Sequence, residues 1–141
     1  MTLTRLPGPL ARSDDQLTNY TIDGPAHRLL MHPFPRRVRA ELAGETLLAT
    51  RNGVLVHETG LPNRYYLPES DMRTELLTAT DTRTVCPYKG WASYWTLTVD
   101  GRDLADVAWG YQTPLDESAR IKGYRSFLHD ELTTEVDGQP L

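Results

Sequence analysis

A ten-residue stretch, CPYKGWASYW at residues 86–95, concentrates the side chains of this chain that could do chemistry. It holds the only cysteine, one of the two lysines and four aromatic residues. The thiolate is the nucleophilic form of cysteine, and a nearby cation lowers the pKa of a thiol. Lys89 follows Cys86 by three residues and could supply that cation. Cys86 is therefore the candidate catalytic residue, for redox or group-transfer chemistry.

The same cysteine also has a structural interpretation. A catalytic thiol normally needs a neighbouring base. All four histidines are distant from Cys86 in sequence: His27, His32, His57 and His129. A lone cysteine before a proline is more often a small buried apolar side chain. Both interpretations stay open at this stage.

The aromatic residues around this stretch predict a binding pocket. Pro87 and Gly90 bracket a turn, which would lift Tyr88 and Lys89 off the following strand to the mouth of the pocket. Pockets are mostly apolar and carry a few placed polar groups. The alternative is that the tryptophans only fill the core. The predicted ligand-binding residues are Arg64, Tyr65, Tyr88, Lys89, Trp91, Tyr94, Trp95, Trp109 and Tyr111.

A second segment, His57-Glu58 followed by a Gly-Leu-Pro turn and Arg64, could cover this pocket, with Arg64 meeting an anion. The histidines do not have recognisable zinc spacing, and Asp100 and Asp103 lie across an expected tight turn. We therefore predict neither a metal site nor a cofactor.

The clearest structural element is a hairpin that would position the aromatic residues. Asp100-Gly101 joins two runs rich in strand-forming residues, Ala92–Val99 and Arg102–Tyr111, and Asp-Gly is a strong hairpin signal. With a two-residue turn, strand alternation places Trp91 and Trp95 on a core face and Tyr94, Trp109 and Tyr111 on the other face. A one-residue bulge at Gly101 would instead bring Trp91, Trp95, Trp109 and Tyr111 together.

Other short strands recur every eight to twelve residues. Ala43-Gly44 and Arg51-Asn52-Gly53 each separate two of them and predict further hairpins. Pro68 to Asp71 suggests one helical turn, and the run after Pro114 suggests a short C-terminal helix capped by Asp116. The fold class is therefore mainly β, a rolled antiparallel sheet or small open barrel with one short C-terminal helix. The remaining expected strands are Val38–Leu42, Glu45–Ala49, Val54–Glu58, Arg64–Leu67, Met72–Thr78 and Tyr124–Leu128.

The length and net charge of the chain indicate its domain organisation and bear on its partners. A chain of 141 residues predicts one domain, here residues 20–141, preceded by a flexible arm over residues 1–19 that has no apolar period. A net charge of −4 argues against a nucleic-acid partner. No signal-peptide core or membrane-length apolar run is found, so we expect a cytoplasmic protein without membrane contact.

The chain shows a family resemblance in five segments. In chain order they are GPAHRLL, HETGLPNRYYLP, DTRTVCPYKGWASYW, AWGYQTP and IKGYRSF. It resembles the bacterial family catalogued as domain of unknown function 427, over roughly Tyr20 to Asp130. The resemblance implies a compact β-rich domain of unestablished biochemistry, with no catalytic assignment. The family is sometimes filed under a nucleotidyltransferase-like label, but this chain lacks a Gly-Ser pair followed by Asp-x-Asp metal ligands.

Three functions remain open. The first is a binding module whose aromatic pocket accepts a small planar, cationic or anionic ligand by stacking and cation–π contact. The second is an enzyme that uses Cys86 or Lys89. The third is an interaction or assembly module that uses the N-terminal arm, which leaves a homo-oligomer open.

Overall fold

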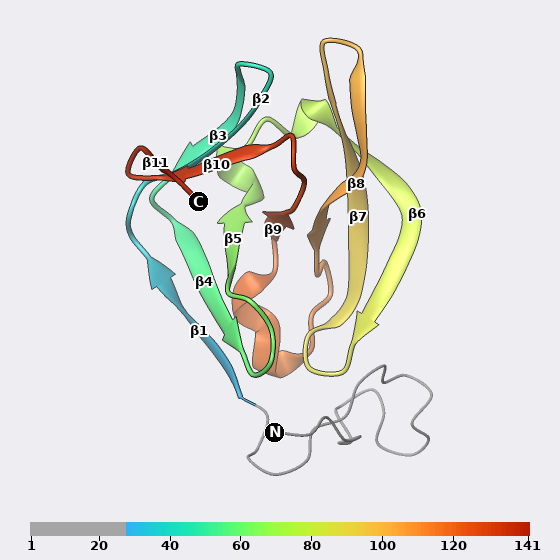
Figure 1. Ribbon diagram of the computed structural model, residues 1–141. Coiled ribbons are helices and arrows are strands. Elements are labelled where there is room, and N and C mark those ends of the chain that lie inside the picture. The colour runs from blue at the N-terminus through green and yellow to red at the C-terminus, as the bar shows by residue number, and fades with distance from the viewer. Residues whose placement is uncertain (1–27) are drawn as a thin grey trace.

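Residues 28–141 are the part of the chain that the computed structural model describes, and strands dominate it (Figure 1). The predicted arm over residues 1–19 lies outside these residues. Within them, the mainly β prediction is confirmed. The helical segments of residues 28–141 are three short 3-10 helices, η1 (Glu69–Asp71), η2 (Thr74–Leu76) and η3 (Asp116–Ile121).

The strands form two sheets in which every pair of neighbours is antiparallel. The larger sheet curls round but does not close into a barrel, because β1 and β6 are its two edges (Figure 1). In spatial order it contains β1 (Leu29–Phe34), β4 (Gly53–Glu58), β5 (Arg64–Pro68), β9 (Tyr124–Phe127), β8 (Arg102–Gly110), β7 (Gly90–Val99) and β6 (Leu77–Cys86). The smaller sheet contains β11 (Gln139–Pro140), β10 (Thr133–Val136), β2 (Val38–Leu42) and β3 (Glu45–Thr50).

The main core lies between the two sheets. In β2 every second residue is buried, so Val38, Ala40 and Leu42 face the larger sheet. From the larger sheet, Trp95 and Leu97 of β7 join the same cluster. A second, smaller cluster surrounds Tyr66 and Tyr111. It is this second cluster that positions the candidate site.

The predicted β7–β8 hairpin is confirmed. Asp100 and Gly101 both have positive φ, at 50° and 75°, as the two central residues of this turn require. Leu97 pairs with Leu104, whereas Trp95 pairs with Ala108, so β8 carries extra residues before Ala108.

The extra residues in β8 settle which aromatic side chains are neighbours. Because their number is even, the faces of the strands are kept, and Tyr94 lies opposite Trp109. The alternative of a one-residue bulge at Gly101 is wrong, since the irregularity lies farther along the strand. The expectation that Trp91 faces the core is also wrong, because 46% of its surface is exposed.

The predicted hairpin at Asn52-Gly53 is wrong, because β3 and β4 belong to different sheets. Neither residue has the positive φ that a tight hairpin needs. Instead, the Asn52 amide N–H donates to Thr50 Oγ1 at 3.0 Å, and Asn52 Nδ2 donates to Asp71 at 3.2 Å. These side-chain contacts hold a corner at which the chain passes from one sheet to the other.

Two further expectations need correction. Met72 makes a single bridge with Leu48, and the run up to Leu76 includes the 3-10 helix η2, so the expected strand over 72–78 begins late, at Leu77. The expected C-terminal helix is the kinked 3-10 helix η3, with Leu115 rather than Asp116 at its cap position. Strands β9, β10 and β11 follow it, so it is not C-terminal.

The kink in η3 coincides with a tertiary contact. Ser118 has non-helical backbone angles, and its buried hydroxyl donates to the Tyr88 carbonyl at 2.9 Å. This hydrogen bond holds Ser118 against the β6–β7 loop. None of the helices in residues 28–141 is long and apolar enough to span a membrane.

Candidate functional site

A small pocket, here called the aromatic pocket, opens where the β4–β5 loop, the β6–β7 loop and the end of β8 meet. The β4–β5 and β6–β7 loops lie at the lower end of the molecule in Figure 1. The pocket has a volume of about 170 Å³. The described residues that line it are Val56, Glu58, Leu61, Pro62, Arg64, Tyr66, Lys89, Trp109 and Tyr111.

The β6–β7 loop is the CPYKG motif, and η3 holds it in place. Cys86 pairs with Gly90 across a turn of three residues, and Gly90 has a φ of 108°, which favours glycine. The Lys89 carbonyl accepts a hydrogen bond of 3.0 Å from the Leu115 amide. Together with the hydrogen bond from the Ser118 hydroxyl to the Tyr88 carbonyl, this contact holds the loop in place and directs Lys89 toward β4.

The polar centre of the pocket is a buried ion pair between Lys89 and Glu58. The Lys89 ammonium donates to Glu58 Oε1, and only 8% and 4% of the two side chains are exposed. Lys89 Nζ also lies 3.7 Å from Cys86 Sγ and 5.8 Å from the centre of the Tyr111 ring. A buried charge is tolerated when it is paired in this way.

The surroundings of Lys89 determine its protonation. Burial lowers the pKa of Lys89, but attraction to the acidic groups around it, Glu58 among them, raises the pKa further than burial lowers it, so the net shift is upward. The amine therefore stays protonated at neutral pH and is a poor nucleophile. The expectation that the turn lifts Lys89 to the pocket mouth is wrong, because its ammonium is buried and paired with Glu58.

Two buried tyrosines complete the inner wall. Burial raises the pKa of both Tyr66 and Tyr111 above the ordinary tyrosine value. The Trp109 indole N–H donates to the Tyr66 hydroxyl at 3.1 Å. Both phenols are therefore neutral, and Tyr66, which accepts from Trp109, keeps a proton that it can donate.

Arg64 supplies the available positive charge. Its guanidinium carbon lies 6.0 Å from the centre of the Trp109 ring. Across residues 28–141, no carboxylate lies within ion-pair distance of Arg64. Because Glu58 already balances Lys89, Arg64 is the uncompensated cation among the described residues that line the pocket.

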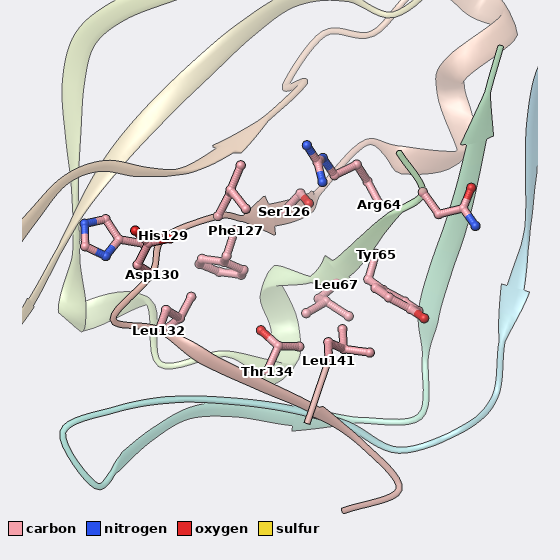
Figure 2. Close-up of a pocket in the computed structure, with 12 residues that line it drawn as sticks. Arg64, Tyr65, Leu67, Ser126, Phe127, His129, Asp130, Leu132, Thr134 and Leu141 are labelled. Carbon is pink, nitrogen blue, oxygen red and sulfur yellow. The ribbon is translucent and has the colours of Figure 1, made fainter. Parts of the chain in front are cut away.

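A larger cavity, here called the large cavity, lies beside the aromatic pocket and has a volume of about 440 Å³ (Figure 2). Arg64 lines both spaces. Sequence reasoning missed the large cavity because strand β10, which contributes Thr134, was not predicted. Its described lining residues are Asn63, Arg64, Tyr65, Leu67, Ser126, Phe127, Leu128, His129, Asp130, Leu132, Thr134 and Leu141.

The structure brings four of the predicted binding residues together in the aromatic pocket, namely Arg64, Lys89, Trp109 and Tyr111. Tyr65 lies instead in the large cavity, where its ring contacts Phe34 edge-on at 4.9 Å.

The other four predicted binding residues are absent from the described lining of either cavity: Tyr88, Trp91, Tyr94 and Trp95. The Tyr94 and Thr84 hydroxyls share a hydrogen bond of 2.9 Å. Trp95 is a core residue whose ring lies 4.0 Å from the Arg125 guanidinium carbon. Trp91 is on the surface, and the backbone carbonyl of Tyr88 is held by Ser118.

Sequence reasoning also missed Glu58 and Tyr66 as site residues. A usable signal existed for Glu58, because Val54, Val56 and Glu58 alternate along β4 and all three are buried. A carboxylate on the buried face of a strand indicates a buried partner.

Within residues 28–141, no three Cys, His, Asp or Glu side chains are close enough to hold a metal ion.

Comparison with known proteins identifies a family. No curated protein matches the chain significantly. Residues 30–138 match a family model described as a domain of unknown function, DUF427, which carries the label NTP_transf_9. The match covers most of the chain, as the CPYKG, AWGYQTP and IKGYRSF segments predict. The chain therefore belongs to the DUF427 family.

Proposed function

We propose that this protein is a binding module that takes a small planar anion into the aromatic pocket. The observation that carries this proposal is the position of Arg64, a cation without a carboxylate partner among residues 28–141, beside the Trp109 ring at a concave site. Anionic groups are the natural partners of a guanidinium, and aromatic walls accept planar ligands by stacking.

The size of the pocket limits the ligand. A cavity of about 150 Å³ is known to take benzene, so about 170 Å³ suits one aromatic ring rather than a larger fused system. Tyr66, Trp109 and Tyr111 would surround such a ring. The Tyr66 hydroxyl would donate a hydrogen bond to it or to its anionic group.

The Lys89–Glu58 pair has a supporting role in this proposal. A paired ammonium carries little net charge toward a ligand, so it does not compete with Arg64 for the anion. It ties the β6–β7 loop to the end of β4, and so holds together two segments that line the pocket. The pocket would then be largely formed before the ligand arrives, which lowers the entropy cost of binding.

The enzyme alternative has less support. Lys89 with a raised pKa is protonated and cannot attack a carbonyl group. The cation nearest to the Cys86 thiol is the same ammonium, which already pairs with Glu58. A lone thiol behind a structural ion pair fits a packed side chain better than an activated nucleophile. The assembly alternative depends on residues 1–19, which lie outside the described residues.

Benzoate provides a direct test of the binding proposal. We expect isothermal titration calorimetry to show binding to the wild type. We expect Trp109→Leu to weaken it roughly two- to tenfold, the range of one aromatic contact. Arg64→Met should weaken it at least as much, since it removes the charge.

Two matched variants act as controls. Trp91→Leu removes an exposed tryptophan outside the pocket, and Arg83→Met removes an exposed arginine on β6. Both should leave benzoate affinity within twofold of the wild type. The proposal fails if benzoate does not bind, or if the control variants lower affinity as much as Trp109→Leu and Arg64→Met do.

A further inference from the structure

Arg64 lines both cavities, and the alternation of β5 explains their arrangement. Tyr66 lines the aromatic pocket, whereas its neighbours Tyr65 and Leu67 line the large cavity. Successive residues of a strand point to opposite faces, so a single strand separates the two spaces. Arg64 begins this strand, and its long side chain lines both spaces.

The large cavity has an apolar floor. Leu67, Phe127 and Leu132 line it, and Figure 2 shows the Phe127 ring and the Leu67 and Leu132 side chains around the space. In this view Arg64 extends from β5 toward Ser126 on one side, and His129 and Asp130 lie on the other. A volume of about 440 Å³ falls in the range of small-molecule sites. An aliphatic chain suits such a floor.

We propose that the two cavities form one bipartite site for a carboxylate that carries one aromatic arm and one aliphatic arm. Arg64, which lines both cavities, holds the carboxylate, the aromatic arm enters the aromatic pocket, and the aliphatic arm enters the large cavity. The placement of the aromatic arm rests on the function proposed above. The use of the large cavity, and the aliphatic arm that enters it, are not part of that proposed function.

The charges favour a carboxylate over a phosphate. A single guanidinium matches a carboxylate through two parallel hydrogen bonds and balances its charge. A phosphate dianion would need a second cation nearby. The other basic side chains that line the cavities are Lys89, which Glu58 balances, and His129, which lies beside Asp130 across the large cavity.

Two acylated amino acids test the inference. N-acetyl-L-phenylalanine presents the carboxylate and the aromatic arm, and N-octanoyl-L-phenylalanine adds the aliphatic arm. Each buried methylene is worth roughly fourfold in affinity. We expect calorimetry, below the aggregation concentration of the longer probe, to show at least tenfold tighter binding of the octanoyl compound to the wild type.

Neighbouring residues of β10 supply a matched pair of variants. Thr134 lines the large cavity and Thr133 is exposed. Thr134→Phe fills the cavity and should remove most of the advantage of the octanoyl compound, while leaving N-acetyl-L-phenylalanine affinity within twofold. Thr133→Phe should leave both affinities unchanged. If circular dichroism shows Thr134→Phe to be unfolded, Thr134→Leu serves the same purpose.

The outcomes separate this inference from the proposed function. The bipartite site is refuted if the octanoyl compound gains less than twofold, or if its gain survives in a folded Thr134 variant. In either case the proposed function stands as long as N-acetyl-L-phenylalanine binds and Trp109→Leu weakens that binding. If instead the octanoyl compound binds through Thr134 but Trp109→Leu has no effect, both the aromatic pocket function and the bipartite site are overturned.

Discussion

At the scale of single residues, the buried Lys89–Glu58 pair has a clear energetic consequence. Both side chains are almost fully removed from water, so each ion loses most of its hydration. The mutual attraction compensates for this loss while both partners are present. Removing one partner leaves the other ion buried without its compensation. Replacing both with apolar groups removes the cost together with the attraction.

We therefore expect Lys89→Met to lower the free energy of unfolding by roughly 3 kcal/mol or more, because Glu58 then stays buried without this cation. The double variant Lys89→Met with Glu58→Leu should be more stable than Lys89→Met alone. Urea denaturation of the wild type, both single variants and the double variant gives the coupling between the two residues. Strictly additive effects would show that the pair contributes no coupling.

Arg64 shows how much of a binding site can be predicted from residue type alone. The sequence predicted that this arginine meets an anion, from its place after a Gly-Leu-Pro turn. Its contact with Trp109 joins positions far apart in the sequence, and local spacing does not encode it. Lys89 shows the opposite case. Its residue type marks it as a cation for a ligand, but Glu58, 31 positions away, lies beside it and pairs with it.

At the scale of elements, β8 must approach β9 closely at Gly110. A Cβ atom added there would lie 2.6 Å from the Tyr124 carbonyl oxygen, a distance that real Cβ atoms do not tolerate. The neighbour is backbone, so relief requires the two strands to move apart. Trp109 precedes this position, and its displacement would open the wall of the aromatic pocket.

We expect Gly110→Ala to destabilise the protein by about 1–3 kcal/mol, the usual range for overpacking, and to weaken benzoate binding. Gly53→Ala is the comparison. Its added Cβ would lie 3.2 Å from the end of the Leu67 side chain, which can move. Thermal denaturation should show a clearly smaller loss for Gly53→Ala. Equal losses would contradict the steric argument.

Two turn signals of the same kind formed different structures, which shows that local sequence does not determine which strands pair. Asp100-Gly101 forms the predicted hairpin, because the strands on either side pair with each other. Asn52-Gly53 carries an equally strong signal. There, Thr50 and Asp71 bind Asn52, and the chain turns a corner between sheets. The deciding contact comes from Asp71, outside the window that a turn rule reads.

At the scale of the whole molecule, the sequence predicted an antiparallel β fold with most of its strands, but not the division into two sheets. The smaller sheet depends on β10 pairing with β2, two strands from opposite ends of the described chain. Composition and alternation identify strands but not such distant partners. The large cavity, whose walls come from β5, β9 and β10, could not be predicted for the same reason.

The stability of the whole molecule should fall steeply at alkaline pH. The pKa values of Lys89, Tyr66 and Tyr111 are all raised in the folded state, from ordinary values of 10.5 for lysine and 10.0 for tyrosine. A group with a raised folded pKa holds its proton longer when folded than when unfolded. Its contribution to stability is therefore complete below the unfolded pKa and decreases as pH rises from there toward the folded pKa.

We expect the free energy of unfolding to decrease above about pH 10. Each group that is protonated in the folded state but deprotonated in the unfolded state contributes a decrease of up to about 1.4 kcal/mol per pH unit. Tyr111→Phe removes one such group and should make the decrease above pH 10 shallower than in the wild type. Tyr124→Phe changes a tyrosine that is only half-buried and does not line the aromatic pocket, so it is the control and should keep the wild-type slope. Urea denaturation at intervals between pH 8 and 11 measures these slopes. A wild-type stability that stays constant across this range would contradict the burial of ionisable groups on which the aromatic pocket depends.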